Sequence, residues 1–322
     1  MSRTYYLFSS GELKRKDNTL AFETDSARRI IPVEDIDHIY CFSEISLNNK
    51  LLEFLGKKQI CMHFFDYYGN YTGSFVPREA QLSGCLVVKQ VQHYLEPEKR
   101  LMLARSFIEG AIHNIRRNLE KREKDECCQK IDEYRKNLKQ AETIEEIMST
   151  EAHVRKLYYD QWENITGWEF EARTKRPPEN ALNAMLSFGN VMTYTLIIKE
   201  IYRTALNPTI SFLHEPSERR FSLALDVAEV FKPIFVDRVI FRLTNLKKIK
   251  QKHFDSRVNF SYMTEEGRKI FVSEFEETLE KTILHRNLRR KIKYKNLVRL
   301  DLYKLIKHIL EEDVYVPMKV WW

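Results

Sequence analysis

Glycine and proline are scarce in this chain, at nine each among 322 residues. Long flexible linkers are rich in these residues, so such linkers are excluded. Cysteine is also rare. The chain has five cysteines, an odd number, and none of them form a Cys-x-x-Cys pair. This pattern excludes a zinc ribbon and a secreted disulfide framework, and it indicates a reducing compartment, the cytoplasm.

Several targeting and cofactor signals are missing. The first ten residues lack the basic start, apolar run and small-residue cleavage site of a signal peptide, so we expect no leader. The chain contains no GxxxxGK[ST], GxGxxG, GxSxG or HExxH motif, which excludes the enzyme classes built on those motifs. The uncharged stretch 180–198 is long enough to cross a bilayer. However, Asn180, Asn183, Ser187 and Asn190 form a polar stripe along it, so we predict a buried helix and no membrane span.

Hydrophobic periodicity divides the chain into two halves. Apolar residues make up 43% and charged residues 31%, as in a globular protein, and the length fits two domains. Residues 1–90 contain short β-prone runs separated by turns. We predict a polar turn over 13–19, with Asp17-Asn18 at its tip, and one short helix at about 48–58. Residues 91–322 show helical periodicity, with helices expected over 179–206, 221–243, 264–290 and 296–311. The predicted class is α+β: a small, β-rich, sandwich-like N-terminal domain followed by a larger all-α domain.

Positive charge is concentrated late in the chain. The net charge is +7, yet acidic and basic residues are equal in number in residues 1–90. A first cluster runs through Lys247, Lys248, Lys250 and Lys252. The second cluster contains one acid, Asp301, among ten basic residues: Lys281, Arg286, Arg289, Arg290, Lys291, Lys293, Lys295, Arg299, Lys304 and Lys307. Such clusters favour a polyanion partner, most often nucleic acid, although a solvated helix face paired with the preceding glutamates explains them equally well.

A carboxylate and a histidine stand at unusual positions in the helical half. Glu151 shares a helical stripe with Val154, Tyr158 and other largely apolar residues, so its carboxylate must be paired, protonated or bound to a cation. A salt bridge to Arg155, four residues on, is the simpler explanation. His214 ends the apolar run Ser-Phe-Leu-His, where a histidine is usually structural.

Two further carboxylates lie three residues apart. Asp226 and Glu229 share one face of an otherwise apolar helix, where they repel each other unless a cation intervenes or one is protonated. Lys232 can neutralise Glu229, which leaves Asp226 unexplained. Together with Glu151 and His214, these acids suit a divalent cation such as Mn²⁺ or Mg²⁺ beside a basic surface. This combination is typical of a metal-dependent phosphodiester enzyme.

Three segments carry a resemblance to a known family. They are RPPENALNAMLSFG at 176–189, NPTISFLH at 207–214 and RFSLALDVAEVFKPIFVDR at 220–238. Their order and spacing resemble those of the CRISPR-associated integrase, the adaptation endonuclease often called Cas one. The N-terminal runs YLFSSGELKRKDNTL and IPVEDIDHIYCF are also similar to that family, so the resemblance covers most of the chain.

The resemblance implies a fold, an activity and a site. It implies a β-rich domain that dimerises and a helical domain that holds a divalent metal, Mn²⁺ or Mg²⁺. The implied metal ligands are Glu151, His214 and Glu229, with Asp226 as a further catalytic residue; where the family usually carries Glu-Gly, this chain has Glu151-Ala152. Asn183 and Lys232 are expected to support these ligands.

The implied activity is the insertion of short duplex DNA into a CRISPR array, with endonuclease activity on DNA. The implied partners are double-stranded DNA, a second copy of the chain and a dimer of the small Cas two protein. The residues expected to contact DNA are Lys247, Lys248, Arg286, Arg289, Arg290 and Lys293. Two other hypotheses stay open: a non-catalytic scaffold for double-stranded DNA, and an interaction protein whose basic helices bind an acidic protein.

Overall fold

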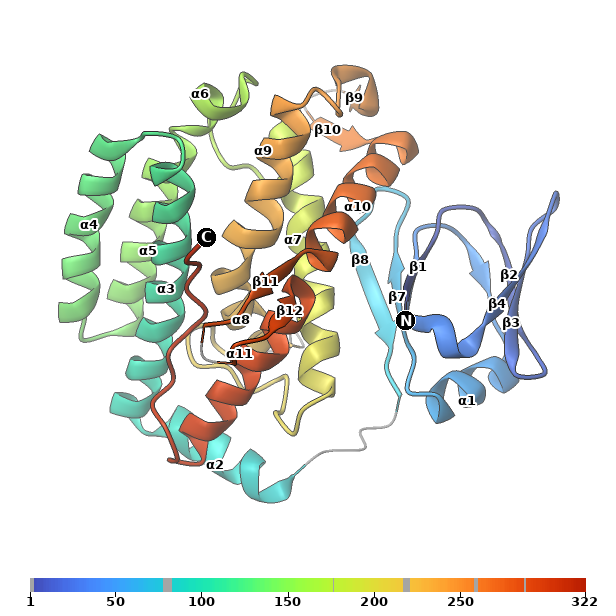
Figure 1. The fold of residues 1–322 in the computed structure, drawn as a ribbon, viewed down its shortest axis with the longest axis horizontal. Helices are drawn as coiled ribbons and strands as arrows, with labels where there is room; N and C mark the ends of the chain where they lie inside the picture. The colour runs from blue at the N-terminus through green and yellow to red at the C-terminus, as the bar shows by residue number, and fades with distance from the viewer. Residues whose placement is uncertain (1–2, 78–82, 176, 217–220, 258–259, 287) are drawn as a thin grey trace. The chain divides into compact units, whose positions relative to one another are not determined.

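The chain folds into two compact units, Met1–Ala80 and Gln81–Trp322, in the computed structural model (Figure 1). The structure describes residues 3–77, 83–175, 177–216, 221–257, 260–286 and 288–322. Parts of two predicted segments, the motif around residue 176 and the one that begins at residue 220, lie outside the described residues. We describe each unit by itself.

The N-terminal unit consists of two four-stranded sheets and one α-helix. The first sheet has the order β1-β5-β7-β8, in which β5 is parallel to β1 and β7, and β8 is antiparallel to β7. The second has the order β4-β3-β2-β6. The bounds are β1 Arg3–Leu7, β2 Gly11–Lys16, β3 Thr19–Glu23, β4 Arg28–Pro32, η1 Val33–Asp35, β5 Ile36–Cys41, β6 Ile45–Ser46, α1 Asn49–Lys57, β7 Cys61–Phe65 and β8 Tyr71–Phe75.

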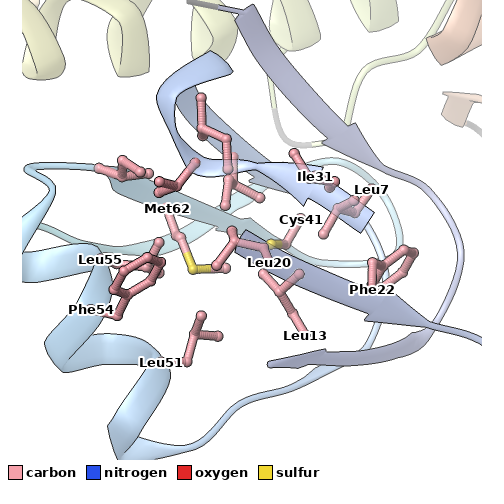
Figure 2. Packing of buried hydrophobic residues seen from close by; sticks show 14 residues of the cluster. Leu7, Leu13, Leu20, Phe22, Ile31, Cys41, Leu51, Phe54, Leu55 and Met62 are labelled. Atoms are coloured by element: carbon pink, nitrogen blue, oxygen red, sulfur yellow. The ribbon is translucent and has the colours of Figure 1, made fainter. Parts of the chain in front are cut away.

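One apolar core joins both sheets and α1. Leu13 and Leu20 from the second sheet, Cys41 and Met62 from the first, and Leu51 from α1 are all buried in it (Figure 2). Burial of large aliphatic side chains on one face of each sheet is what holds such a layered unit together. The prediction of a small, β-rich, sandwich-like domain is therefore confirmed.

The predicted polar turn over residues 13–19 is too long, although its predicted tip at Asp17 and Asn18 is confirmed. Strand β2 extends to Lys16, and only Asp17, at φ 51°, and the next residue form the turn. Leu13 is fully buried, and Lys14 pairs with Glu23 of the neighbouring strand at 2.9 Å. A run of charged residues thus forms a strand because alternate side chains reach the core or a partner across the sheet.

The C-terminal unit is mainly helical, as predicted, but it is not all-α because it also contains two two-stranded sheets. Helices α3, α4 and α5 pack side by side, and α8 packs against both α3 and α7 (Figure 1). Its elements are α2 Gly84–Leu95, α3 Pro97–Glu120, α4 Asp125–Gln140, α5 Ile144–Tyr159, α6 Trp162–Thr166, α7 Ala181–Tyr202, α8 Ser222–Lys232, η2 Pro233–Asp237, α9 Arg238–Asn245, η3 Gln251–His253, β9 Phe254–Arg257, β10 Phe260–Met263, α10 Glu265–Glu280, β11 Thr282–Leu284, β12 Lys291–Lys293 and α11 Tyr294–Ile309.

The helical region begins earlier than residue 91. Helix α2 starts at Gly84, where the side chain of Ser83 accepts a hydrogen bond from the N–H of Leu86. The valines in this helix have a composition that also suits a strand, which hides its start in the sequence. The predicted helix over 221–243 divides at Pro233, which has no N–H, into α8, the π-helical turn η2 and α9.

The predicted helix over 264–290 is also wrong in its second half. Helix α10 ends at Glu280, and strands β11 and β12 then form an antiparallel pair in which Ile283 faces Ile292. Thr282 and Ile283 are β-branched, and Arg286 and Arg290 would place like charges four residues apart on a helix. Both features disfavour continuation of the helix.

Helix α7 is buried in the C-terminal unit. It is the one helix in the described part of the chain that is long and apolar enough to cross a membrane, but 78% of its apolar window is buried inside the protein. The prediction of a buried helix is confirmed. Gly189 allows a close approach, because a Cβ atom there would lie 2.5 Å from Cγ1 of Val236 and 2.8 Å from Cζ of Phe271.

Candidate metal centre

The side chain of Asp226 organises the segment that carries His214. Asp226 lies on α8 and is fully buried. Its carboxylate accepts hydrogen bonds from the N–H groups of Phe212 at 2.7 Å, Leu213 at 3.0 Å and His214 at 3.0 Å. It also bonds Nδ1 of the His214 ring at 2.8 Å. The proton on Nδ1 is therefore assigned to this bond, and the Nε2 lone pair is left for a ligand.

Glu229 lies one helical turn after Asp226 and is held by two cations. Its Oε1 accepts from Nζ of Lys232 at 2.5 Å, and its Oε2 accepts from Nη2 of Arg155. Nε of Arg155 in turn donates to Oε1 of Glu151 at 2.7 Å. Arg155 thus bridges Glu151 on α5 and Glu229 on α8. Both simple ion pairs weighed from the sequence, Glu151 with Arg155 and Glu229 with Lys232, are present.

The electrostatics of this cluster keep Glu229 ionised. Burial alone would raise its pKa, but Lys232 and Arg155 outweigh burial and lower the pKa to about 2. Burial would lower the pKa of His214, but the hydrogen bond and charge of Asp226 raise it. The two carboxylates of Glu151 and Glu229 are therefore balanced within the chain by one guanidinium and one ammonium group.

The donor set has the chemistry of a divalent-metal site. Two carboxylates and one imidazole nitrogen suit Mn²⁺ or Mg²⁺. Among the described residues, however, no three His, Cys, Asp or Glu side chains converge to hold an ion in this conformation, because Glu151 and Glu229 face Arg155. The residue types fit a divalent metal. In this conformation, however, Arg155 occupies both carboxylates that would bind the metal.

A buried acid, Asp237, interacts with Arg155 of this cluster and was not predicted from the sequence as a site residue. Asp237 is 1% exposed, hydrogen bonds to Tyr158, and has one carboxylate oxygen, Oδ2, with no hydrogen-bond partner. Burial raises its pKa to about 6, although Arg155 opposes the shift. The Val-Asp-Arg end of the third motif contains Asp237, so the motif itself was the available signal.

The two residues expected to support the ligands differ in what they contact. Lys232 bonds Glu229, as expected. The side chain of Asn183 instead accepts from Nη1 of Arg173 at 3.0 Å and from the N–H of Thr174 at 3.1 Å, and it donates to the carbonyl of Ala172 at 2.8 Å. Asn183 therefore fixes the 172–174 segment against α7.

The residues expected to contact DNA fall into two groups. Lys248 pairs with Glu274 at 2.6 Å, and Lys293 pairs with Glu280. The others have no acidic partner among the residues that the structure describes: Lys247, Arg286, Arg289 and Arg290. The interpretation of a self-paired helix face thus holds for only part of the basic run.

Comparisons with known proteins show the family of this chain. The family described as CRISPR associated protein Cas1 matches residues 5–277. The chain is similar to CRISPR-associated endonuclease Cas1 2 of Moorella thermoacetica, with 71% identity over 99% of this chain and 100% of the relative. It is 48% identical to CRISPR-associated endonuclease Cas1 of Fusobacterium nucleatum over 100% of this chain and 98% of that relative.

Solved structures of other proteins share the fold of this chain. A Cas1 protein from Thermotoga maritima has a TM-score of 0.90 and 40% identity, over 97% of this chain and 99% of that chain. A casposase bound to its integration product has a TM-score of 0.86 at 20% identity, over 99% of this chain and 94% of that chain, and so shares the fold. The sequence motifs, the α+β architecture and these relatives lead to one conclusion: the chain belongs to the CRISPR associated protein Cas1 family.

Proposed function

We propose that this protein is a CRISPR adaptation integrase, a metal-dependent DNA endonuclease and transesterase that inserts short duplex DNA into a CRISPR array. The single observation that carries the proposal is the geometry around His214. Its ring is fixed by Asp226 through Nδ1, which leaves Nε2 to bind a ligand, and its charge interacts with that of Glu229, which Arg155 links to Glu151. The endonuclease names of the relatives support the same activity.

Glu151, Glu229 and Nε2 of His214 would hold the metal, Mn²⁺ or Mg²⁺. When bound, such a cation lowers the pKa of an attacking hydroxyl and stabilises charge that develops on the phosphate. Asp226 fixes the tautomer and orientation of His214. Mn²⁺ is expected to act at least as well as Mg²⁺, because one donor is an imidazole nitrogen.

Arg155 and Lys232 set the condition for metal binding. They already neutralise Glu151 and Glu229, so a divalent cation would add two positive charges to a balanced cluster. Arg155 must therefore turn away from the carboxylates when the metal binds. The unpartnered Oδ2 of Asp237 is a nearby acceptor, since the charges of Arg155 and Asp237 interact.

DNA and protein partners complete the proposal. The basic residues, above all Lys247, Arg286, Arg289 and Arg290, would contact phosphates without reading sequence, with Lys248 and Lys293 as further contacts. We expect the N-terminal unit to form a homodimer and a small Cas2 protein dimer to bridge two such dimers. A Cas6-RT-Cas1–Cas2 complex shares this fold, with a TM-score of 0.85 at 17% identity over 99% of this chain and 36% of that chain. Action on DNA in the cytoplasm follows from the same proposal.

A non-catalytic scaffold for double-stranded DNA is the second candidate. The observation in its favour is that Arg155 and Lys232 give both carboxylates internal partners. The test is a plasmid-nicking assay with Mn²⁺, Mg²⁺ or EDTA. An integrase nicks in Mn²⁺ and not in EDTA, and His214→Ala removes the nicking. Duplex binding with no metal-dependent cleavage would support the scaffold.

A further inference from the structure

His214 lies on a segment without regular secondary structure. Residues 203–216, all of which the structure describes, form neither a helix nor a strand. No helix or sheet ladder fixes the backbone of these residues, so other groups must bond its N–H and C=O groups. Two residues of α8 supply some of these bonds: Asp226 accepts from the N–H of His214 at 3.0 Å, and Oγ of Ser222 donates to the carbonyl of Thr209 at 2.9 Å.

A single buried amide, that of Gln90, holds the start of this segment from a second helix. Gln90 lies on α2 and is fully buried. Its Oε1 accepts from the N–H of Asn207 at 3.0 Å, and its Nε2 donates to the carbonyls of Asn207 and Ile210, both at 2.9 Å. An oxygen atom in place of Nε2 would face two carbonyl oxygens, so these three bonds require an amide at this position.

The end of the segment is held from the same region. Nη2 of Arg100, near the start of α3, donates to Oε1 of Glu215 at 2.5 Å. The hydroxyl of Tyr94, one helical turn after Gln90 on α2, donates to Oε2 of Glu215 at 2.8 Å. Helix α2 therefore holds the segment on both sides of His214.

Bonds from two helices restrain the segment more than bonds from one. The bonds from α8 set His214 relative to Glu229, which lies on that same helix. Bonds from α8 alone would let the segment turn about this helix, whereas those from α2 remove that freedom. A metal ligand must be held within a fraction of an ångström of its bound position, so this restraint bears directly on metal affinity.

We propose that Gln90 is a positioning residue of the metal centre, whose three hydrogen bonds hold the 207–210 segment so that His214 presents Nε2 to the metal. Gln90 touches neither metal nor DNA in this account, and it acts through the backbone of the segment that carries His214. The inference rests on the proposed function, because it takes the cluster around His214 to be the metal centre.

The affinity of the full-length chain for Mn²⁺, measured by electron paramagnetic resonance, tests this role. Gln90→Met keeps the size of the side chain and removes all three bonds. It should weaken Mn²⁺ binding about tenfold, the low end of the cost when a metal site loses a supporting contact. Gln90→Glu should weaken it at least as much, because its carboxylate would face the carbonyls of Asn207 and Ile210. In EDTA, amide hydrogen exchange at His214 should become faster in Gln90→Met.

Asn114 on α3 is the matched control, because its buried amide makes the same three kinds of bond to other parts of the chain. Its Oδ1 accepts from the N–H of Val320, and its Nδ2 donates to the carbonyls of Met318 and Val230, all at 2.9 Å. Asn114→Leu should lower the melting temperature but leave the Mn²⁺ affinity nearly unchanged. Since Val230 lies on α8, this control also covers a general loosening of the helix that carries Glu229.

Weaker Mn²⁺ binding in both Gln90 variants but not in Asn114→Leu would support the proposal. Unchanged binding in a folded Gln90→Met variant would overturn it, as would an equal loss in Asn114→Leu. Where Gln90→Met does not fold, Tyr94→Phe removes one hydroxyl from the same helix and should weaken binding about threefold; no change would overturn the proposal. Failure of the proposed function would show separately, as no Mn²⁺ binding by the unmodified protein or as unchanged binding in His214→Ala, and either result would overturn this inference as well.

Discussion

The carboxylates of the metal centre and the basic residues of the β11–β12 hairpin are opposite in how their charges are satisfied. Glu229 and Glu151 are matched inside the chain by Lys232 and Arg155. By contrast, Arg286, Arg289 and Arg290 have no acidic partner among the described residues, although Lys293 of β12 pairs with Glu280. A region that balances its own charge must reorganise before it accepts a cation, whereas a region with unbalanced charge attracts a polyanion directly. Under the proposed function, chemistry belongs to the first region and DNA attachment to the second.

The largest expected effect separates these two roles. His214→Ala, Glu229→Ala and Glu151→Ala should each lower metal-dependent nicking by about a hundredfold or more, because loss of a ligand removes charge stabilisation and nucleophile positioning together. Duplex binding, measured by filter retention, should stay close to that of the unmodified protein. Melting curves control for folding. If His214→Ala melts normally and still nicks DNA at the full rate, chemistry does not reside in this region.

The second prediction concerns pH and Asp237. Its pKa is raised from 3.8 to about 6 in the folded chain, so the folded state holds this proton more tightly than the unfolded state. This contribution to stability is present at low pH and is lost as the pH rises through that window. Above it, ionised Asp237 costs roughly 3 kcal/mol of unfolding free energy.

Asp237→Asn has no proton to lose and should be more stable than the unmodified protein at pH 7, by an amount that shrinks towards pH 4. Urea unfolding of the two proteins at a series of pH values gives this difference, in which the other groups cancel. A difference that does not change with pH would show that Asp237 is ionised throughout.

The third prediction is a smaller effect and concerns whether Arg155 competes with the metal. Arg155→Gln removes the cation that bridges Glu151 and Glu229, so it should lower the melting temperature without metal and strengthen Mn²⁺ binding about tenfold, or 1.4 kcal/mol. Electron paramagnetic resonance of free Mn²⁺ measures the affinity. Arg116→Gln, which breaks a comparable ion pair with Glu120 on α3, is the matched control. Weaker Mn²⁺ binding in Arg155→Gln would mean that Arg155 positions the carboxylates and does not compete with the metal.

The smallest effect concerns salt. Each phosphate contact contributes about −0.9 to the slope of log affinity against log salt for duplex DNA. Arg289→Gln and Arg290→Gln should each reduce the slope by about that amount. Lys293→Gln should reduce it less, since Lys293 is paired with Glu280. Equal changes at all three positions would show that internal pairing does not decide which cations reach DNA.

Local chemistry made much of this structure predictable. The polar stripe of α7 follows from the helical periodicity of 3.6 residues. The residues of the pairs Glu151–Arg155 and Glu229–Lys232 are one helical turn apart, so both pairs could be predicted from the sequence. The bond from Arg155 to Glu229 could not, because it joins residues 74 apart in the chain and depends on how α5 packs near α8.

Other features could not be predicted from the sequence, for related reasons. Asp226 binds three backbone N–H groups, and no side-chain pattern reports a backbone contact. The β11–β12 hairpin lies in a run of basic residues, and its strands of three residues each are too short to show a clear period of two. Gln90 bonds Asn207, which lies 117 residues later in the chain. In each case tertiary packing, and not local preference, decides the outcome.

Anomalous X-ray scattering from crystals soaked in Mn²⁺ tests the central claim most directly. The account predicts a single strong peak bounded by Glu151, Glu229 and Nε2 of His214, with the Arg155 side chain turned away from both carboxylates. The same soak of His214→Ala should lose the peak. A peak elsewhere in the chain, or none at all with Arg155 still bridging Glu151 and Glu229, would contradict the assignment of this cluster as the metal centre.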